Sequence, residues 1–176
     1  MINLSTKLDE LLASIPEVVK RAEEVSLQTM LGAFLQRIFN EGKATDGNMI
    51  GVYSEKFKIK ASEVALSGLN KNARKRTDSI QEKRVLYKQL RQIAGRQVQY
   101  VDLQFTDRLF KSIKVVELND HYVLGFTDPD RAKIAHDNEI RFKKKIFIPT
   151  AEEIEKAKEA YYDYLREEIQ DIFNRW

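Results

Sequence analysis

Cysteine is absent from the 176-residue sequence. Its absence excludes a disulfide framework and any metal site built on thiolates, and it is compatible with a reducing compartment. The chain also lacks an apolar run approaching the roughly 20 residues that span a bilayer. Because its first residues show no basic stretch followed by an apolar core, we expect a soluble protein, made inside a cell, with no membrane contact.

Residues that commonly carry catalysis are scarce. The two histidines, His121 in a predicted strand and His136 in a predicted loop, show no metal-ligand spacing, and the sequence has no phosphate-binding glycine loop and no nucleophile elbow. Four acidic residues gather in one stretch: Asp128, Asp130, Asp137 and Glu139. The first two flank a proline and are better explained by turn and helix-capping chemistry. We therefore expect no enzymatic activity, no metal and no cofactor.

In the first forty residues, apolar side chains recur at the three- and four-residue spacing of a helix. Apolar residues over positions 4–12 predict a short amphipathic helix that Pro16 limits. The sequence Ser14-Ile-Pro-Glu17 fits a capping box with proline in the first turn, so a long core-facing helix should follow, run to about Asn40 and end at Gly42.

Turn-forming residues follow, from Gly42 to about Lys60, and predict a loop with a short strand. The pair Asp46-Gly47 lies early in this loop. Residues 61–69 allow one more helical turn.

The strongest charge feature lies between Lys71 and Arg96, although the net charge of the whole chain is only +3. This segment holds nine basic residues against two acidic ones. Ser79 and Glu82 fit a second capping box, which predicts a helix from about Ile80 to Ala94 with its basic residues outward. Residues 70–77 should form a mobile loop.

Three interpretations of segment 71–96 remain open. It could neutralise nucleic-acid phosphates, dock an acidic protein neighbour, or be an ordinary solvated helix face. Tyr87 and Tyr100 are its only aromatic neighbours for base stacking, which makes sequence-specific recognition a poor explanation. We favour docking, with the loop ordered by its partner. The candidate interface residues are Lys71, Arg74, Lys75, Arg76, Lys83 and Arg84.

A sheet is predicted in the second half. Strand-forming runs at 113–118 and 121–126 flank the turn-forming pair Asn119-Asp120, which predicts a hairpin. Residues 97–103 alternate in a way that suits a strand joining it. Ahead of the hairpin, Thr106 can cap a short helical turn holding Leu109 and Phe110.

A final helix should begin at a third capping box, Thr150 to Glu153, and run nearly to Trp176. Its outer face is acidic. Identical subunits could meet head to tail through a basic middle and an acidic end, although the acidic face could equally be a solvated one. Because no long exposed apolar stripe is apparent, we expect the purified protein to be monomeric or weakly associating.

These elements predict a single α+β domain over residues 1–176. Long N-terminal, middle and C-terminal helices should pack on a small, mostly antiparallel β-sheet.

The order of the motifs resembles the tail completion proteins of tailed bacteriophages, also called virion morphogenesis proteins, which work at the joint between head and tail. The shared order is FTDRLFKSI, a hairpin ending in VLGF, a His-Asp-Asn-Glu segment, a basic linker and IFIPTAEE before a closing helix. Asp107 and Glu139 stand where the family pattern has glycine. The matching positions are Asp46, Gly47, Thr106, Leu109, Ser112, Ile113 and Pro149.

The resemblance implies a structural virion protein that completes the tail or neck and enables head–tail joining, as a ring of copies of itself. Its expected neighbours are neck, connector or tail-tube proteins, and it would meet genomic DNA only as the DNA passes through the joint. The expected location is the virion tail or neck, and the host cytoplasm during assembly. The alternative is a non-specific nucleic-acid-binding protein that uses residues 71–96.

Overall fold

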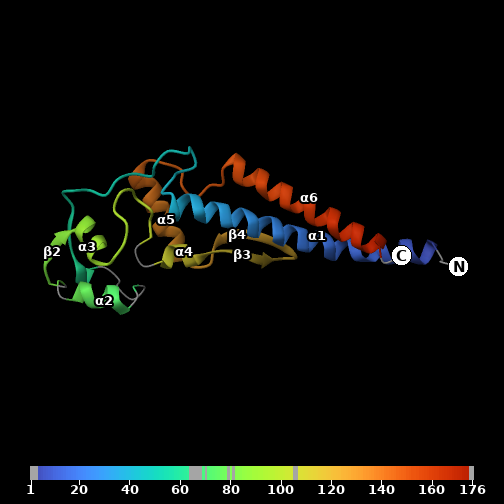
Figure 1. Ribbon diagram of the computed structural model, residues 1–176, viewed down its shortest axis with the longest axis horizontal. Coiled ribbons are helices and arrows are strands. Elements are labelled where there is room, and N and C mark those ends of the chain that lie inside the picture. The colour runs from blue at the N-terminus through green and yellow to red at the C-terminus, as the bar shows by residue number, and fades with distance from the viewer. Residues whose placement is uncertain are drawn as a thin grey trace. The chain divides into compact units, whose positions relative to one another are not determined.

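The computed structural model describes residues 4–63, 69, 71–78, 80, 82–104 and 107–174. The chain divides into two compact units. Unit 1 comprises Met1–Phe34, Lys114–Gly125 and Pro149–Trp176, and unit 2 comprises Leu35–Ile113 and Phe126–Ile148. Within the described residues, six α-helices and two small antiparallel sheets confirm the predicted α+β class (Figure 1).

Helix α1 (Leu4–Leu35) passes without interruption through Pro16, so the predicted break there is wrong. Proline removes one hydrogen bond from the helix, but ending the helix and nucleating a second one costs more. Ser14, expected to cap the second helix, donates its hydroxyl to the Leu11 carbonyl at 2.8 Å instead. A π-helical turn, Gln36–Asn40, follows, and the chain leaves the helix at Gly42 (φ 64°), as predicted.

In unit 1, α6 (Ala151–Asn174) lies alongside α1 (Figure 1). Arg21 of α1 and Tyr164 of α6 lie close enough to interact electrostatically. Helix α6 starts at the predicted capping box: the Thr150 N–H donates to Glu153 Oε2 at 2.7 Å, and the Glu153 N–H donates to Thr150 Oγ1 at 3.1 Å. Two of the orphan donors of the first turn are satisfied in this way.

The predicted hairpin is confirmed. Strands β3 (Ile113–Leu118) and β4 (His121–Phe126) pair with each other. Asn119 and Asp120 have φ of 50° and 65°, the left-handed backbone that a two-residue turn of this kind requires and that Asn and Asp tolerate. The hairpin contacts α1 through an ion pair of 2.6 Å between Lys20 and Glu117.

The second sheet, in unit 2, pairs β1 (Lys58–Lys60) with β2 (Arg84–Leu86). The fold therefore has two separate two-stranded sheets in place of the single expected sheet. Strand β2 also corrects the predicted middle helix, because α3 (Tyr87–Ile93) begins only after this extended segment. The Gln89 side chain accepts the Leu86 N–H at 3.3 Å at that start. Ser79, the expected cap, lies outside the described residues.

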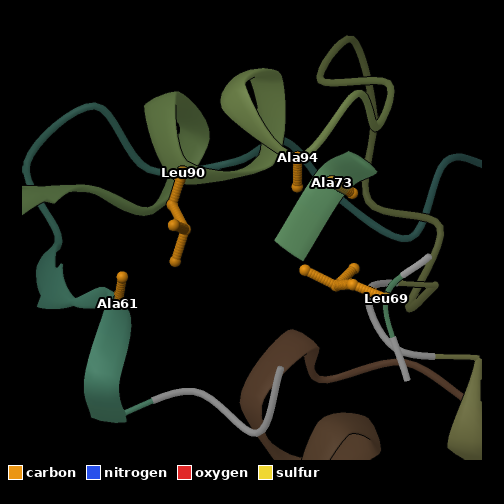
Figure 2. Packing of buried hydrophobic residues seen from close by; sticks show 5 residues of the cluster. All are labelled: Ala61, Leu69, Ala73, Leu90 and Ala94. Atoms are coloured by element: carbon orange, nitrogen blue, oxygen red, sulfur yellow. The ribbon is translucent and has the colours of Figure 1, made fainter. Parts of the chain in front are cut away.

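The expected mobile loop over residues 70–77 is wrong in its described part, because Lys71–Asp78 form helix α2. Ala73 of this helix belongs to one buried cluster with Leu90 of α3 and Ala94 at its C-terminal cap (Figure 2). Burial of this face anchors the helix despite its charged exterior. The cluster comprises Ala61, Leu69, Ala73, Leu90 and Ala94.

Residues 97–103 do not form the expected strand. The Gln97 side chain holds this stretch in an irregular turn, since its amide donates to the Tyr100 carbonyl at 2.7 Å and its oxygen accepts the Gln99 N–H at 3.0 Å. These local bonds compete with strand pairing. Earlier in the chain, one more helical turn is expected within residues 61–69. The described part of that stretch begins with a 3₁₀ turn, Ala61–Glu63.

Two further helices complete unit 2, α4 (Arg108–Ser112) and α5 (Pro129–Phe142). The Asp128 side chain accepts the Asp130 N–H at 2.9 Å, which confirms the predicted capping role. His136, expected in a loop, belongs to α5, because this cap and Pro129 at the first helical position start a helix.

Candidate interaction site

The six candidate interface residues are all exposed. On α2, the four basic residues are exposed while Ala73 and Thr77 are buried. The Thr77 hydroxyl donates to the Arg74 carbonyl at 2.8 Å, so even this polar residue is satisfied inside the unit. We call the exposed set the basic surface: Lys71, Arg74, Lys75, Arg76, Lys83 and Arg84.

The sequence predicts that the basic residues of the middle helix point outward. The structure differs, because some basic residues of segment 71–96 are paired or buried. The Lys88 ammonium lies 3.2 Å from the Glu55 carboxylate, and the Arg96 guanidinium lies 2.9 Å from that of Asp107. Arg91 is only 1% exposed. Lys88, Arg91 and Arg96 therefore form ion pairs within unit 2, and the six residues of the basic surface are exposed.

Arg91 is the centre of a buried polar network. Its Nε donates to the Gln97 carbonyl at 3.0 Å, and its Nη2 donates to both carboxylate oxygens of Asp102. Its guanidinium lies 4.4 Å from the centre of the Tyr53 ring. The Tyr53 hydroxyl donates to Asp102 Oδ1 at 2.8 Å. A buried cation with this many partners fixes the loop geometry around it.

Burial raises the pKa of the Tyr53 hydroxyl well above its ordinary value. Burial also raises the pKa of Tyr87, whose ring lies 5.7 Å from that of Tyr53. In both cases desolvation disfavours the phenolate. Both phenols therefore stay protonated at neutral pH.

Next to this network, unit 2 carries a cleft of about 460 Å³. Such a volume is within the range of roughly 300–1,000 Å³ that is usual for ligand-enclosing sites. Its apolar wall includes side chains from four separate segments: Val52, Phe57, Tyr87, Leu103, Ile134 and Phe142. Sequence patterns do not predict the cleft, because these segments meet only in the folded unit.

Three arginines other than Arg91 also line the cleft. Arg131 contacts Asp128 at 3.4 Å. The Arg141 guanidinium lies 5.9 Å from the centre of the Phe57 ring and 5.5 Å from that of Phe142. Arg108 is exposed, and no ion pair of the described residues includes it. The cleft therefore combines an apolar wall with positive charge.

The family-motif positions fall in three places. Leu109, Ser112 and Ile113 are buried together where α4 meets β3, and Ser112 Oγ donates to the Leu109 carbonyl at 2.7 Å. Thr106 lies outside the described residues. Asp107, which replaces the family's glycine, has φ 60°, a backbone conformation that glycine adopts readily.

The Asp46-Gly47 turn forms as predicted, with Gly47 at φ 77° and Asp46 Oδ1 accepting the Asn48 N–H at 3.0 Å. The Asn48 side chain, together with this backbone hydrogen bond, lowers the pKa of the Asp46 carboxyl. Nearby, Thr45 donates its N–H to the Lys145 carbonyl at 2.9 Å. The loop and the apolar IFIP stretch, about a hundred residues apart in sequence, are thereby joined. Pro149 follows that stretch and precedes α6.

Arg37 and Glu139 strengthen the same junction. The buried Arg37 guanidinium donates to the carbonyls of Lys43, Ile146 and Ile148 at 3.1–3.2 Å. Glu139, in place of the family's second glycine, accepts the Ile146 N–H at 2.6 Å and the Phe147 N–H at 3.0 Å. Sequence patterns could not identify these roles, because carbonyl-bound arginines have no local signature.

In unit 1, α6 exposes both acidic and apolar side chains. Tyr162, Ile169 and Phe173 are 61%, 40% and 49% exposed. Their spacing of seven and four residues places them on one side of the helix, and we call them the α6 ridge. The premise that no exposed apolar stripe exists is therefore wrong. Beside the ridge runs an exposed acidic row at four-residue spacing, Glu159, Asp163 and Glu167.

Among the described residues, no group of three or more His, Cys, Asp or Glu side chains could hold a metal ion. None of the described helices is long and apolar enough to cross a membrane. Comparisons with models of protein families, with characterised proteins and with solved structures gave no significant match.

Proposed function

We propose that this chain is a structural virion protein of a tailed phage, which completes the tail or neck and enables head–tail joining as a ring subunit. The order of motifs from Asp46-Gly47 to IFIPTAEE suggests this role. Two of the segments that carry those motifs, the loop around Asp46 and the IFIP stretch, are joined in unit 2 by hydrogen bonds of Thr45 and Arg37.

The observation that carries the proposal is the basic surface. A folded helix, anchored by Ala73 and Thr77, holds the exposed Lys71, Arg74 and Lys75, while Lys88, Arg91 and Arg96 of the same segment are in ion pairs. Charge of one sign held on a fixed element favours an oppositely charged partner and speeds the encounter with it. The partner in this proposal is an acidic neighbour in the neck or tail.

The test is to remove the chain from a phage that encodes it and to examine infected cells by electron microscopy. We expect filled heads and separate tails to accumulate side by side, and joining to return when the chain is supplied from a plasmid. Normal virions in its absence would refute the proposal. Empty heads without free tails would also refute it, because they would place the defect before joining.

The alternative function is non-specific nucleic-acid binding through the basic surface. Exposed lysines and arginines could neutralise phosphates, and affinity would then fall steeply with salt. Binding to duplexes of unrelated sequence, measured from 50 to 200 mM salt, separates the two functions. A salt-dependent affinity that is lost with Lys71→Glu and Arg74→Glu would favour this alternative.

A further inference from the structure

The lining of the unit 2 cleft indicates which kind of ligand would fit it. Its wall is apolar, and Arg108, Arg131 and Arg141 add positive charge to it. Burying apolar surface there is favourable, while a neutral apolar ligand would bring no counter-charge to Arg108 and Arg141, which form no ion pair among the described residues. A segment that carries both large apolar side chains and carboxylates fits this chemistry.

The α6 ridge has these properties. It presents one aromatic ring, one branched aliphatic side chain and a second aromatic ring along a single helix face. Asp163 of the neighbouring acidic row is paired with Arg166 at 2.8 Å, but Glu159 and Glu167 would bring carboxylates to the arginines. Partly exposed apolar side chains of this size on one stripe are typical of an interaction face.

We infer that the α6 ridge of one copy docks in the cleft of a second copy. This inference rests on the proposed ring and assigns the surfaces of its subunit contact. The two surfaces differ, so the contact is heterologous: each copy offers a ridge to one neighbour and a cleft to the other. Repetition of such a contact produces a closed ring or an open filament, whereas a two-fold contact would stop at a dimer.

The test uses two full-length variants that each disable one surface. The cleft variant carries Arg108→Glu and Arg141→Glu, which leaves the Arg91 network and the Arg131–Asp128 pair unchanged. The ridge variant carries Glu159→Arg and Glu167→Arg, which reverses the acidic row at exposed positions. Circular dichroism and thermal unfolding verify that both variants keep the wild-type fold.

Sedimentation velocity over a range of concentrations then measures association. We expect the wild type to self-associate and each variant alone to do so at least tenfold more weakly. An equimolar mixture should associate again, because the intact ridge of the cleft variant meets the intact cleft of the ridge variant and the two reversed surfaces carry complementary charges. A chain with all four substitutions should regain self-association, because the charges are exchanged.

Three results would overturn the inference. They are a wild type that remains monomeric at every concentration, variants that associate as the wild type does, and a mixture that stays monomeric. If the cleft instead serves a small anionic molecule or another virion protein, the second result follows. None of these measurements depends on virion joining, so failure here is distinct from failure of the proposed function.

Discussion

Nη2 of Arg91 donates to both carboxylate oxygens of Asp102, at 2.8 and 2.9 Å, and the two side chains are 1% and 5% exposed. This buried pair joins α3 to the irregular segment after Gln97, and Arg91 also lines the cleft of unit 2. Its loss would leave a charge buried without its counterion.

Asp102→Ala should therefore lower the free energy of unfolding by about 3–5 kcal/mol. The matched control is Glu55→Ala, which removes the carboxylate of the exposed Lys88–Glu55 pair and should cost at most about 1 kcal/mol. Urea unfolding followed by circular dichroism measures both. Equal effects of the two substitutions would contradict the structural role of the Arg91–Asp102 pair.

Stability should fall as the pH rises above about 10, the ordinary tyrosine pKa. Burial raises the pKa of Tyr53 in the folded state, so above pH 10 the unfolded chain loses this proton while the folded chain keeps it. The contribution is present below pH 10 and is lost as the pH increases further. Unfolding midpoints measured from pH 9 to 11 should decrease less steeply in Tyr53→Phe. An identical slope in this variant would show that Tyr53 is not the residue responsible.

Gly42→Ala should be more destabilising than Gly47→Ala. Both glycines have positive φ, 64° and 77°, and alanine in this conformation costs about 1–2 kcal/mol. A Cβ at Gly42 would also lie 2.2 Å from the Tyr100 ring and 2.7 Å from the Val101 carbonyl oxygen, whereas nothing lies within 4 Å at Gly47. The difference between the thermal unfolding midpoints of the two variants measures the destabilisation caused by the steric clash at Gly42. A Gly47→Ala variant as unstable as Gly42→Ala would rule out the close approach of Tyr100.

The capping box of α6 should also be measurable. Thr150→Ala removes the side chain that accepts the Glu153 N–H, and the expected loss is about 0.5–2 kcal/mol of unfolding free energy. Thr150→Ser keeps the hydroxyl and serves as the control. No difference between the alanine and serine variants would mean that the cap does not stabilise this helix.

Turn-forming and capping residues correctly predicted those elements that are determined by hydrogen bonds among a few neighbouring residues. The Asn119-Asp120 hairpin, the Thr150–Glu153 box and the Asp128 cap all satisfy their own backbone groups. The N-terminal break at Pro16 was wrong, because continuing a long helix outweighs one lost hydrogen bond.

Long-range partners decided the rest. Strand β2 exists because β1 pairs with it, and local sequence there favoured a helix. Arg91 looked like one more surface cation, but Asp102 and the Gln97 carbonyl hold it inside. The cleft and the α6 ridge required the positions of side chains, which composition and periodicity do not give.

The central claim is that the basic surface is an assembly contact. Its most direct test reverses Lys71, Arg74 and Lys75 to glutamate and leaves Arg76 intact, since the Arg76 guanidinium lies against Gly95. The control reverses the exposed Lys56, Lys114 and Lys133, which changes net charge equally. Exposed positions tolerate substitution within about 0.5 kcal/mol each, so both proteins should fold.

The measurement is the fraction of heads joined to tails, counted in electron micrographs of cells that carry each variant in place of the wild-type chain. We predict that the basic-surface variant yields filled heads and separate tails, while the control yields joined virions. Normal virion yield from the basic-surface variant would contradict the claim.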